Sequence, residues 1–464
     1  MTGASPATMT LLDCARHLGA RLFLPSADVA SAFRGVSTDS RSISPGELFV
    51  ALAGENFDGH QYTGQAQQRG AAAAMVETIQ DVPIAQLVVG DAMWAYGQLA
   101  QRWRSRFSLP VIALTGSNGK TTVKEMLRAI LVAHCGLQSQ VLATEGNLNN
   151  NIGVPQTMLH LGAEHRWAVF EMGMNHLGEI DYLTRLVVPD VTLVIMAGTA
   201  HIGELGSRAA IAKAKGEIFA GLRDDGIACI NADDQFCEYW CDQIGANNQR
   251  RIITFGTHAD ADLRGELQSG GLTLFSGGDE VQVTLRVAGE HNQRNALAAA
   301  AAAIAVGVPL VTVGRGLGQF AGVDGRLRTY AGVNSSTVID DSYNANPDSM
   351  QAAIKVLAEK NGRRLLVLGD MGELGADAAA MHAQIGRDAR LAKVDLLYAL
   401  GENAYGYVEN FGEGAKHFQS VDDLLAELLP QLDGNTTVLI KGSRFMKMER
   451  VVEKIALDYQ KGKH

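Results

Sequence analysis

Apolar and polar positions along the chain fall into two patterns, which predict short strands and amphipathic helices. Short apolar runs bounded by Gly, Asp and Asn lie at 48–52, 71–76 and 87–89, and such runs are typical of strands. They predict a small mixed α/β unit at the start of the chain. From Asp91 to Arg104 apolar residues recur at helical spacing, and the segment 107–110 predicts a hinge after that helix.

Strands and helices alternate in the middle of the chain. The apolar run 111–115 is followed by a Gly-rich turn and then by a helix with Val123, Met126 and Ile130 on one face. Further strands are predicted at 167–171, 191–196, 226–230 and 251–255. Because strands that alternate with helices form parallel sheets with both faces covered, we expect such a sheet here.

An uncharged stretch at 296–313 is about as long as a membrane span. Most of it is alanine, and Gly307 and Pro309 interrupt it. We interpret the stretch as a buried helix that begins near Asn295, followed by a turn and a strand. No membrane span is therefore expected.

The last part of the chain repeats the alternation on a smaller scale and begins near 316–324. Its predicted strands lie at 337–339, 364–368, 396–400 and 437–440. A chain of 464 residues has room for about three domains. The predicted fold class is therefore α/β, with domains at 1–88, 89–317 and 318–464 and a ligand cleft between the last two.

Composition narrows the class of protein. The chain has 40 Lys and Arg against 50 Asp and Glu, a formal charge of −10, which argues against a general binder of nucleic acid or anionic membranes. The five cysteines are too few and too scattered for a disulfide framework, so reduced thiols are expected. The segment Met1–Met9 lacks the basic and apolar regions of a signal peptide. A cytoplasmic protein is expected.

A Gly-rich turn between a predicted strand and a predicted helix has the residues of a phosphate-binding loop. Glycines let backbone N–H groups surround phosphate oxygens, and the helix dipole favours negative charge. Lys120 can neutralise the outer phosphates, and the Thr121 hydroxyl can bind Mg²⁺. Leu114 stands where the full Walker pattern has a glycine, so the loop is a shortened form. We predict that nucleotide phosphates bind at Gly116, Ser117, Asn118, Gly119, Lys120, Thr121 and Thr122.

Polar side chains at two strand ends are candidate metal ligands. Glu171 ends the strand 167–171, and His201 follows the strand 191–196 by a few residues. Ligands gather at the carboxyl ends of parallel strands, so both side chains are expected near the phosphate loop.

Lys215 falls on the apolar side of a predicted helix at 207–222. At 100° per residue it shares a stripe with Ile211 and Ile218, whereas Lys213 falls on the opposite side. An inward Lys215 either extends to the rim of the sheet or is a lysine of the catalytic cleft whose pKa is lowered by burial.

These motifs together resemble the Mur ligases of peptidoglycan synthesis. The phosphate loop 115–122, Glu171 at its strand end, and His201 with a lysine fourteen residues later belong to that pattern. Separate motifs in each domain carry the resemblance over nearly the whole chain. In the first domain they are 36–41 and 45–52, and in the last domain 341–347 and 368–375.

The resemblance implies a three-domain architecture with a central parallel sheet of the P-loop ATPase type and a Rossmann-like C-terminal domain. The N-terminal domain would bind the UDP substrate, the central domain ATP, and the C-terminal domain the acceptor. The implied enzyme is an ADP-forming amide ligase that uses ATP and Mg²⁺. It would add D-Ala-D-Ala to UDP-N-acetylmuramoyl-tripeptide through an acyl phosphate, as the last cytoplasmic step of the precursor peptide, and act as a monomer.

The resemblance also assigns site residues. Catalytic roles would fall to Lys120, Glu171, His201 and Lys215. Thr121 and Glu171 would hold one Mg²⁺, and His201 with N-carbamoylated Lys215 a second. Besides the phosphate loop, ATP would contact Asn292, Asn295, Arg326 and Asn344. The substrates would contact Ser40, Arg41, Thr144, Glu145, Asn149, Asn150, Asn346 and Asp370.

Two alternatives stay open at this point. Within the class, the chain could be another Mur ligase or a ligase similar to folylpolyglutamate synthase. Outside it, the phosphate loop could serve a nucleotide-driven switch that hydrolyses ATP without ligation, although a switch needs no third domain with acceptor residues.

Overall fold

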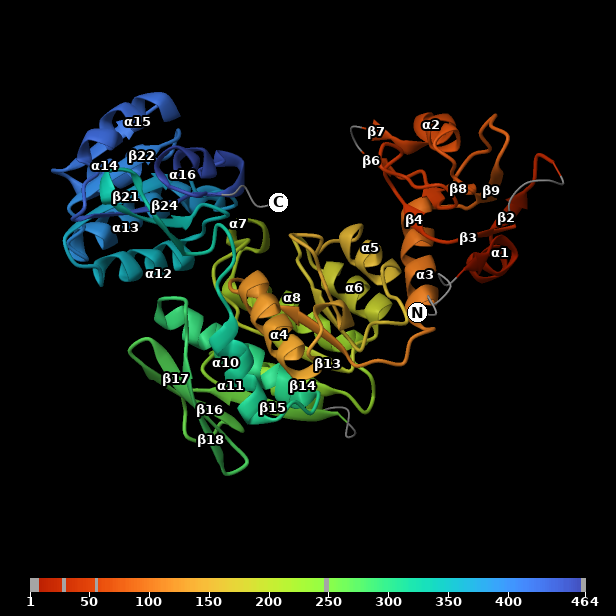
Figure 1. The fold of residues 1–464 in the computed structure, drawn as a ribbon, viewed down its shortest axis with the longest axis horizontal. Helices are drawn as coiled ribbons and strands as arrows, with labels where there is room; N and C mark the ends of the chain where they lie inside the picture. Colours follow the sequence, from red (N-terminus) through yellow and green to blue (C-terminus); the bar gives the residue numbers. More distant parts are fainter. Residues whose placement is uncertain (1–7, 27–30, 55–56, 246–249, 460–464) are drawn as a thin grey trace.

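The computed structural model describes residues 8–26, 31–54, 57–245 and 250–459. They form three lobes, with the central lobe between the N-terminal and C-terminal lobes (Figure 1). Most of the segment Met1–Met9, on which the expected absence of a signal peptide rests, lies outside the described residues. No helix in the described part of the chain has both the length and the apolar character needed to cross a membrane.

The N-terminal lobe is built on a five-stranded sheet, and the three strands predicted there are confirmed. The order is β2-β9-β8-β5-β4, with β2 antiparallel at one edge and the others parallel. The strands are β2 (Arg21–Phe23), β4 (Val36–Ser37), β5 (Leu48–Val50), β8 (Ala73–Val76) and β9 (Ala85–Val88). The lobe also contains α1 (Leu11–Leu18), α2 (Thr63–Gln68) and the short pairs β1 (Met9–Thr10) with β3 (Ala32–Phe33) and β6 (Ala53–Gly54) with β7 (Phe57–Asp58).

Helix α3 (Ala92–Arg104) connects this lobe to the central lobe and confirms the predicted helix. The side chain of Asp91 accepts a hydrogen bond from the backbone N–H of Trp94 at 2.8 Å, which stabilises the start of the helix. Near the other end, Trp103 Nε1 donates to the carbonyl of Leu161 at 3.0 Å. The buried residues of α3 belong to one apolar cluster with both lobes, so the two lobes are packed together along this helix.

The central lobe contains a nine-stranded sheet with the order β11-β12-β10-β13-β14-β15-β16-β17-β18. Strands β11 to β16 run parallel, as expected, and β16 to β18 form an antiparallel extension. The strands predicted here are confirmed: β10 (Val111–Thr115), β12 (Trp167–Glu171), β13 (Val191–Val194), β14 (Ile227–Asn231) and β15 (Arg251–Gly256). Those not predicted are β11 (Val141–Ala143), β16 (Leu263–Gln268), β17 (Gly271–Ser276) and β18 (Asp279–Thr284).

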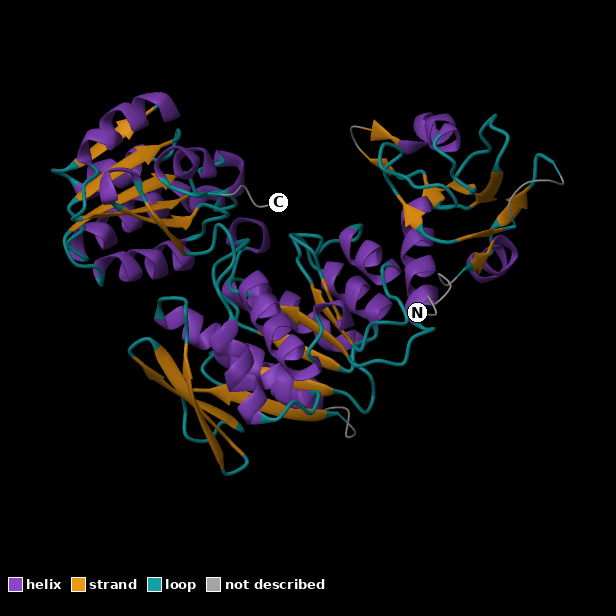
Figure 2. Ribbon diagram, in the orientation of Figure 1, coloured by secondary structure: helices purple, strands orange, loops and turns teal. Residues whose placement is uncertain are grey.

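Helices cover both faces of this sheet (Figure 2). Successive residues of β10 alternate between faces: Ile112 and Leu114 belong to one apolar cluster, and Val111 and Ala113 to another. The covering helices are α4 (Lys120–Cys135), α5 (Gly153–Leu159), α6 (Glu179–Val187), α7 (Ile202–Leu205), α8 (Arg208–Gly216), α9 (Cys237–Gly245), α10 (Glu290–Ala305) and α11 (Leu310–Gln319).

The segment after Gly307 is helical, so the strand predicted within 296–313 is wrong. Pro309 is the N-cap residue of α11, and Leu310, Val313 and Leu317 are buried at helical spacing. The helix packs against α4. Consecutive β-branched residues favour a strand locally, but this packing stabilises the helical form.

The C-terminal lobe is a second, six-stranded sheet with helices on both faces. Its order is β19-β20-β24-β21-β22-β23, with β19 antiparallel at the edge. The four predicted strands are confirmed as β20 (Thr337–Asp341), β21 (Arg363–Gly369), β22 (Leu396–Leu400) and β24 (Thr436–Lys441), while β19 (Arg328–Ala331) and β23 (Ala415–Phe418) are additional. The helices are α12 (Pro347–Ala358), α13 (Ala378–Leu391), α14 (Tyr405–Phe411), α15 (Val421–Leu428) and α16 (Glu449–Ile455).

Candidate active site between the central and C-terminal lobes

The predicted phosphate loop joins β10 to α4 at the carboxyl edge of the central sheet. Gly119 has a φ of 81°, in the left-handed region, and a Cβ there would collide with the side-chain oxygen of Asn295. Glycine is therefore required on two grounds, conformation and space. Lys120 begins α4, and its Nζ donates to the carbonyl of Gly116 at 2.8 Å. This bond keeps the ammonium folded back over the loop.

A cavity of about 320 Å³ lies over this loop. It is lined by the phosphate loop from Ser117 to Thr122, by Asn149, Glu171 and His201 of the central lobe, and by Arg326, Asn344 and Asn346 of the C-terminal lobe. The cavity therefore joins segments that are more than 200 residues apart in the sequence. A direct contact between them is the hydrogen bond that Asn346 Nδ2 donates to Asn118 Oδ1 at 2.7 Å.

Glu171 is buried at the carboxyl end of β12, with 2% of the residue exposed. Its Oε1 accepts a hydrogen bond from Asn149 Nδ2 at 2.8 Å, and its Oε2 lies 3.8 Å from Lys124 Nζ. Oε2 has no hydrogen-bond partner among the described residues. A buried carboxylate oxygen without such a partner is a suitable ligand for a hard cation.

His201 forms a contact between the two lobes. Its Nδ1 lies 2.8 Å from Glu373 Oε2 of the C-terminal lobe, and this contact lowers the pKa of the Glu373 carboxyl. Both residues have φ near +62°, at 63° for His201 and 62° for Glu373. Such conformations cost about 1 kcal/mol or more in non-glycine residues and are concentrated at functional sites.

Lys215 is fully buried and Lys213 is exposed, which confirms the predicted orientation of the helix. The α-helix ends at Gly216, and a 3₁₀ turn continues the same buried stripe. Lys215 Nζ has no hydrogen-bond partner among the described residues. Burial, and then the nearby charge of Lys120, lower the pKa of Lys215 well below its usual range. Lys215 is not among the residues that line the cavity.

Other predicted residues lie outside the cavity. In the N-terminal lobe, Ser40 Oγ donates to Gln65 Oε1 at 2.6 Å and Arg41 pairs with Asp39 at 2.8 Å. Thr144 accepts through Oγ1 from the backbone N–H of Glu171, and Glu145 is exposed beside it. Asn150 accepts from the backbone N–H of Gly153 at the start of α5.

Asn292, Asn295 and Asp370 are buried and do not line this cavity. Asn295 Nδ2 donates to Asn292 Oδ1 at 3.3 Å behind Gly119. Asp370 Oδ2 accepts from the backbone N–H of Asn403 at 3.1 Å, inside the C-terminal lobe. The loop that follows Asp370 lines the cavity with Gly372, Glu373 and Leu374.

Sequence reasoning missed several lining residues: Asn147, Asn175, Tyr343, Glu373 and Arg444. Arg326 lies over the ring of Tyr343, with its guanidinium carbon 4.1 Å from the ring centroid. Arg444 comes from the segment after β24, whose strand end was predicted. Glu171 was selected because polar residues at the carboxyl end of a parallel strand often bind ligands. The same rule would have selected Arg444.

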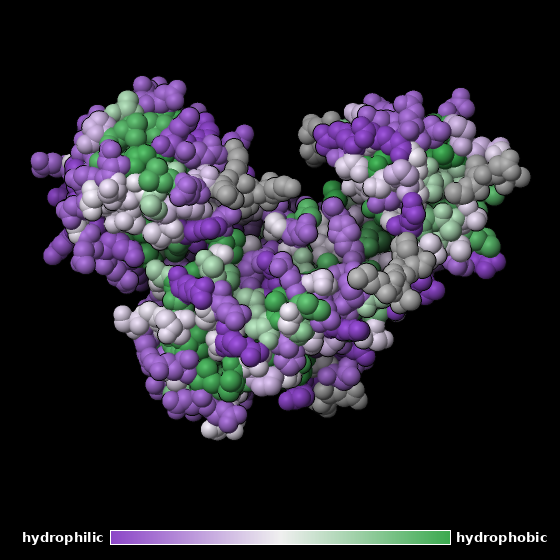
Figure 3. Space-filling model, viewed as in Figure 1, coloured by the Kyte–Doolittle hydropathy of each residue, from purple (hydrophilic) through white to green (hydrophobic). Residues whose placement is uncertain are grey.

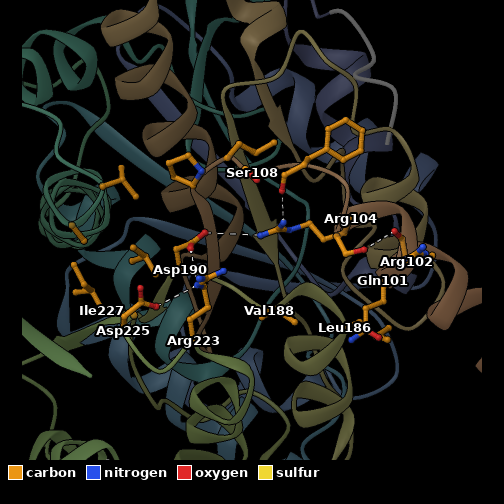
Figure 4. A pocket seen from close by; sticks show the side chains of 18 of the residues that line it. Gln101, Arg102, Arg104, Ser108, Leu186, Val188, Asp190, Arg223, Asp225 and Ile227 are labelled. Atoms are coloured by element: carbon orange, nitrogen blue, oxygen red, sulfur yellow. Dashed lines mark hydrogen bonds and ion pairs between the residues drawn. The ribbon is translucent and has the colours of Figure 1, made fainter. Parts of the chain in front are cut away.

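A larger cavity, of about 850 Å³, lies at the opposite edge of the central sheet (Figure 4). It is lined by residues before β10, β13 and β14, including Arg104, Asp190 and Arg223. Asp190 lies 3.3 Å from Arg223 Nε and 4.0 Å from Arg104 Nη2. The cavity is at the amino ends of the strands, so it is separate from the phosphate loop.

Comparisons with known proteins agree with this fold and site. Three family models match in succession: "Mur ligase family, catalytic domain" at residues 32–104, "Mur ligase middle domain" at 114–303, and "Mur ligase, glutamate ligase domain" at 325–444. The chain belongs to the Mur ligase family.

Among its relatives is UDP-N-acetylmuramoyl-tripeptide–D-alanyl-D-alanine ligase of Escherichia coli (strain K12), which is 42% identical over 422 residues, 90% of this chain and 92% of the relative. A crystal structure of MurF from Acinetobacter baumannii matches with a TM-score of 0.88 at 37% identity, over 97% of this chain and 99% of that one. MurF ligase from Thermotoga maritima in complex with ADP has a TM-score of 0.79 at 24% identity, over 90% of this chain and 96% of that one, and shows the shared fold.

Proposed function

We propose that the protein is an ATP-dependent ligase that joins D-Ala-D-Ala to UDP-N-acetylmuramoyl-tripeptide in the cytoplasm, as a monomer. The observation that carries the proposal is the cavity at which Lys120, buried Glu171 and Arg326 meet. The relatives named above support the choice of substrates, and the 42% identity to the Escherichia coli enzyme favours it over another Mur ligase or a folylpolyglutamate synthase-like enzyme.

The three lobes divide the work in this proposal. Residues 1–88 bind the UDP group with Ser40 and Arg41. Residues 89–317 bind ATP, and residues 318–464 bind the acceptor. Thr144, Glu145, Asn149 and Asn150 follow β11 and contact the sugar-peptide part of the substrate. Asn292 and Asn295 contact the adenine, and Asn344 and Asn346 close on the nucleotide from the C-terminal lobe.

The reaction needs a leaving group better than oxide on the tripeptide carboxylate. A carboxylate oxygen attacks the γ-phosphorus of ATP, and ADP leaves. The neutral dipeptide amine then attacks the acyl carbon and loses a proton, and the tetrahedral intermediate expels phosphate to leave the amide. Attack of one anion on another is favoured by cations placed between them. Lys120 supplies this charge at the phosphate loop, and Arg326 supplies it from the C-terminal lobe.

The residues present fit Mg²⁺. Glu171 Oε2 is buried without a hydrogen-bond partner among the described residues, and Thr121 lines the same cavity. No group of three or more His, Cys, Asp or Glu is placed to hold a metal within the described ranges. The proposed second ligand set pairs His201 with Lys215, which would have to be carbamoylated to bind a cation. Mg²⁺ bound at Thr121 and Glu171, and at His201 and Lys215, would reduce the charge repulsion between phosphate and carboxylate oxygens.

Lys215 suits carbamoylation because burial lowers its pKa. The neutral amine adds to the carbon of CO₂ and loses a proton, which converts a cation into a carboxylate-like ligand. The exposed Lys213 stays an ordinary ammonium group. The buried position of Lys215 without a hydrogen-bond partner among the described residues supports this proposal over an extended chain that reaches the rim.

Phosphate release from ATP tests the proposed function. It should require both UDP-N-acetylmuramoyl-tripeptide and D-Ala-D-Ala, and omission of either should stop it. Phosphate release without both substrates would instead indicate a nucleotide switch, and release with glutamate or a diamino acid as acceptor would indicate another ligase of the class.

A further inference from the structure

The geometry points to Arg444 as the residue that binds the terminal carboxylate of the acceptor dipeptide, an inference that rests on the proposed function. Four basic side chains line the cavity in the described part of the chain: Lys120, His201, Arg326 and Arg444. Lys120 belongs to the phosphate loop. Burial lowers the pKa of the Lys120 ammonium, and Arg326 is close enough to Lys120 that its positive charge also lowers this pKa. His201 pairs with Glu373. Arg444 is the basic group that remains for an acceptor anion.

Arg444 lies where three loops of the C-terminal lobe converge. Ser443 Oγ accepts from the backbone N–H of Gly372 at 2.8 Å and lies 3.2 Å from the carbonyl of Ala345, to which it donates. The three loops follow β20, β21 and β24, which are neighbours in the parallel sheet. Ligands of open α/β sheets bind at this carboxyl edge. Arg444 is therefore placed at the expected ligand edge of the lobe that faces the phosphate loop.

One hydrogen bond orients the guanidinium of Arg444 and leaves its other N–H groups without a partner among the described residues. One Nη donates to Glu449 Oε1 at 2.9 Å, and the guanidinium carbon lies 5.6 Å from the ring centroid of Tyr343. This is the one hydrogen bond of the side chain among the described residues, and 46% of the side chain is exposed. The other N–H groups are free to take a carboxylate in the planar, bidentate geometry that arginine favours.

The surfaces next to Arg444 suit small methyl groups. Ala345 and Leu374 line the cavity on two of the converging loops, and both are buried. Gly372 lines the same cavity, and a Cβ there would lie 2.9 Å from the ring of Phe445. A cation beside small apolar walls matches a short dipeptide with two methyl groups and one carboxylate.

The test compares D-Ala-D-Ala with D-Ala-D-alaninamide, in which the carboxylate is replaced by a neutral amide. The wild-type enzyme should show a KM for the amide about 10- to 100-fold higher, as expected when a charged hydrogen bond is lost. Arg444→Gln should raise the KM for D-Ala-D-Ala by a similar factor and reduce the ratio between the two acceptors toward one. The KM values for ATP and for the UDP substrate should change less than about twofold.

Arg387→Gln is the matched control, because Arg387 is an exposed arginine of α13 in the same lobe and does not line the cavity. It should keep the wild-type ratio. ADP–ATP exchange that depends on the UDP substrate, measured without acceptor, should persist in Arg444→Gln and shows that the variant is folded. Full discrimination between dipeptide and amide in Arg444→Gln would overturn the inference, as would an equal rise in the KM for ATP. If the wild-type enzyme released no phosphate with D-Ala-D-Ala, the proposed function itself would fail.

Discussion

At the scale of the residue, burial gives chemically identical side chains different roles. Lys120 is held over the phosphate loop by its bond to Gly116, Lys215 is buried without a hydrogen-bond partner among the described residues, and Lys213 is exposed on the same helix. Burial lowers the pKa of both Lys120 and Lys215. Of these three lysines, Lys120 lines the cavity, so its side chain is suited to contact phosphate. The buried amine of Lys215, without a hydrogen-bond partner among the described residues, is suited to modification.

Lys120→Ala should lower kcat by roughly two to four orders of magnitude, because one main electrostatic stabiliser of the transferred phosphoryl group is lost. The thermal unfolding midpoint should stay close to that of the wild-type protein, since the side chain packs over a loop. Steady-state phosphate release and a melting curve measure the two effects. Turnover near the wild-type level would contradict the assignment of the phosphate loop.

Lys215→Ala should lose most activity, and a small carboxylic acid such as acetate or formate should restore part of it by replacing the carbamate. Lys213→Ala serves as the control and should remain close to wild type, because its side chain is in solvent. The measurement is turnover against acid concentration for all three proteins. Strong loss in the Lys213 variant with normal activity in the Lys215 variant would refute the proposed role.

At the scale of the element, strand β20 carries a buried carboxyl with an unusual titration. Asp340 is fully buried, and its Oδ1 accepts from the backbone N–H of Ser342 at 3.1 Å. Its Oδ2 has no hydrogen-bond partner among the described residues. Burial raises the pKa of Asp340 from 3.8 to about 6. The folded protein therefore keeps the proton on Asp340 to a higher pH than the unfolded chain does.

The pH dependence of stability follows from this shift. Between pH 3.8 and about 6 the folded state keeps a proton on Asp340 that the unfolded state has lost, so the free energy of unfolding decreases as pH rises through that window. Asp340→Asn should remove this part of the slope and raise stability at pH 7.5 by on the order of 1–3 kcal/mol. Urea denaturation at several pH values measures it, with Asp225→Asn, whose side chain is 80% exposed, as the control. An unchanged slope in the Asp340 variant would contradict the argument.

At the scale of the whole molecule, the central and C-terminal lobes already touch, whereas a hollow separates the N-terminal and C-terminal lobes (Figure 3). The contacts between the central and C-terminal lobes include Asn346 with Asn118 at 2.7 Å, Asp348 with the backbone N–H of Thr199 at 2.7 Å, and His201 with Glu373 at 2.8 Å. Polar contacts of this kind hold two domains together only loosely. Relative motion of the domains is the usual expectation for such interfaces.

The lobes should close further when the substrates bind, because the UDP group and the acceptor are proposed to bind on opposite sides of the central lobe and must react at one cavity. X-ray scattering with a non-hydrolysable ATP analogue and the UDP substrate should give a smaller radius of gyration than the free protein. The analogue alone is the control and should change the radius less. An unchanged radius with both ligands would contradict closure.

The sequence by itself determined the elements and the chemistry that local patterns express. Most parallel strands of both large sheets, the phosphate loop before α4 and the inward direction of Lys215 follow from periodicity and spacing, which depend on near neighbours. It misassigned the end of the stretch 296–313, where β-branched residues favour a strand and packing against α4 stabilises a helix. It also missed β16 to β18, which form antiparallel pairs. Buried and exposed residues alternate irregularly along these strands, so the pattern that predicts a strand is weak there.

Only the tertiary structure decided which residues share the cavity. It joined Asn346 to Asn118 and Glu373 to His201 across two lobes, brought Arg444 to the same cavity, and placed Asp370 against Asn403 behind its loop. These contacts depend on how two separately folded sheets meet, and no local pattern of apolar and polar positions encodes that distance. Sequence motifs therefore predicted a phosphate-binding loop, whereas the arrangement of the lobes decided which residues share a cavity with that loop.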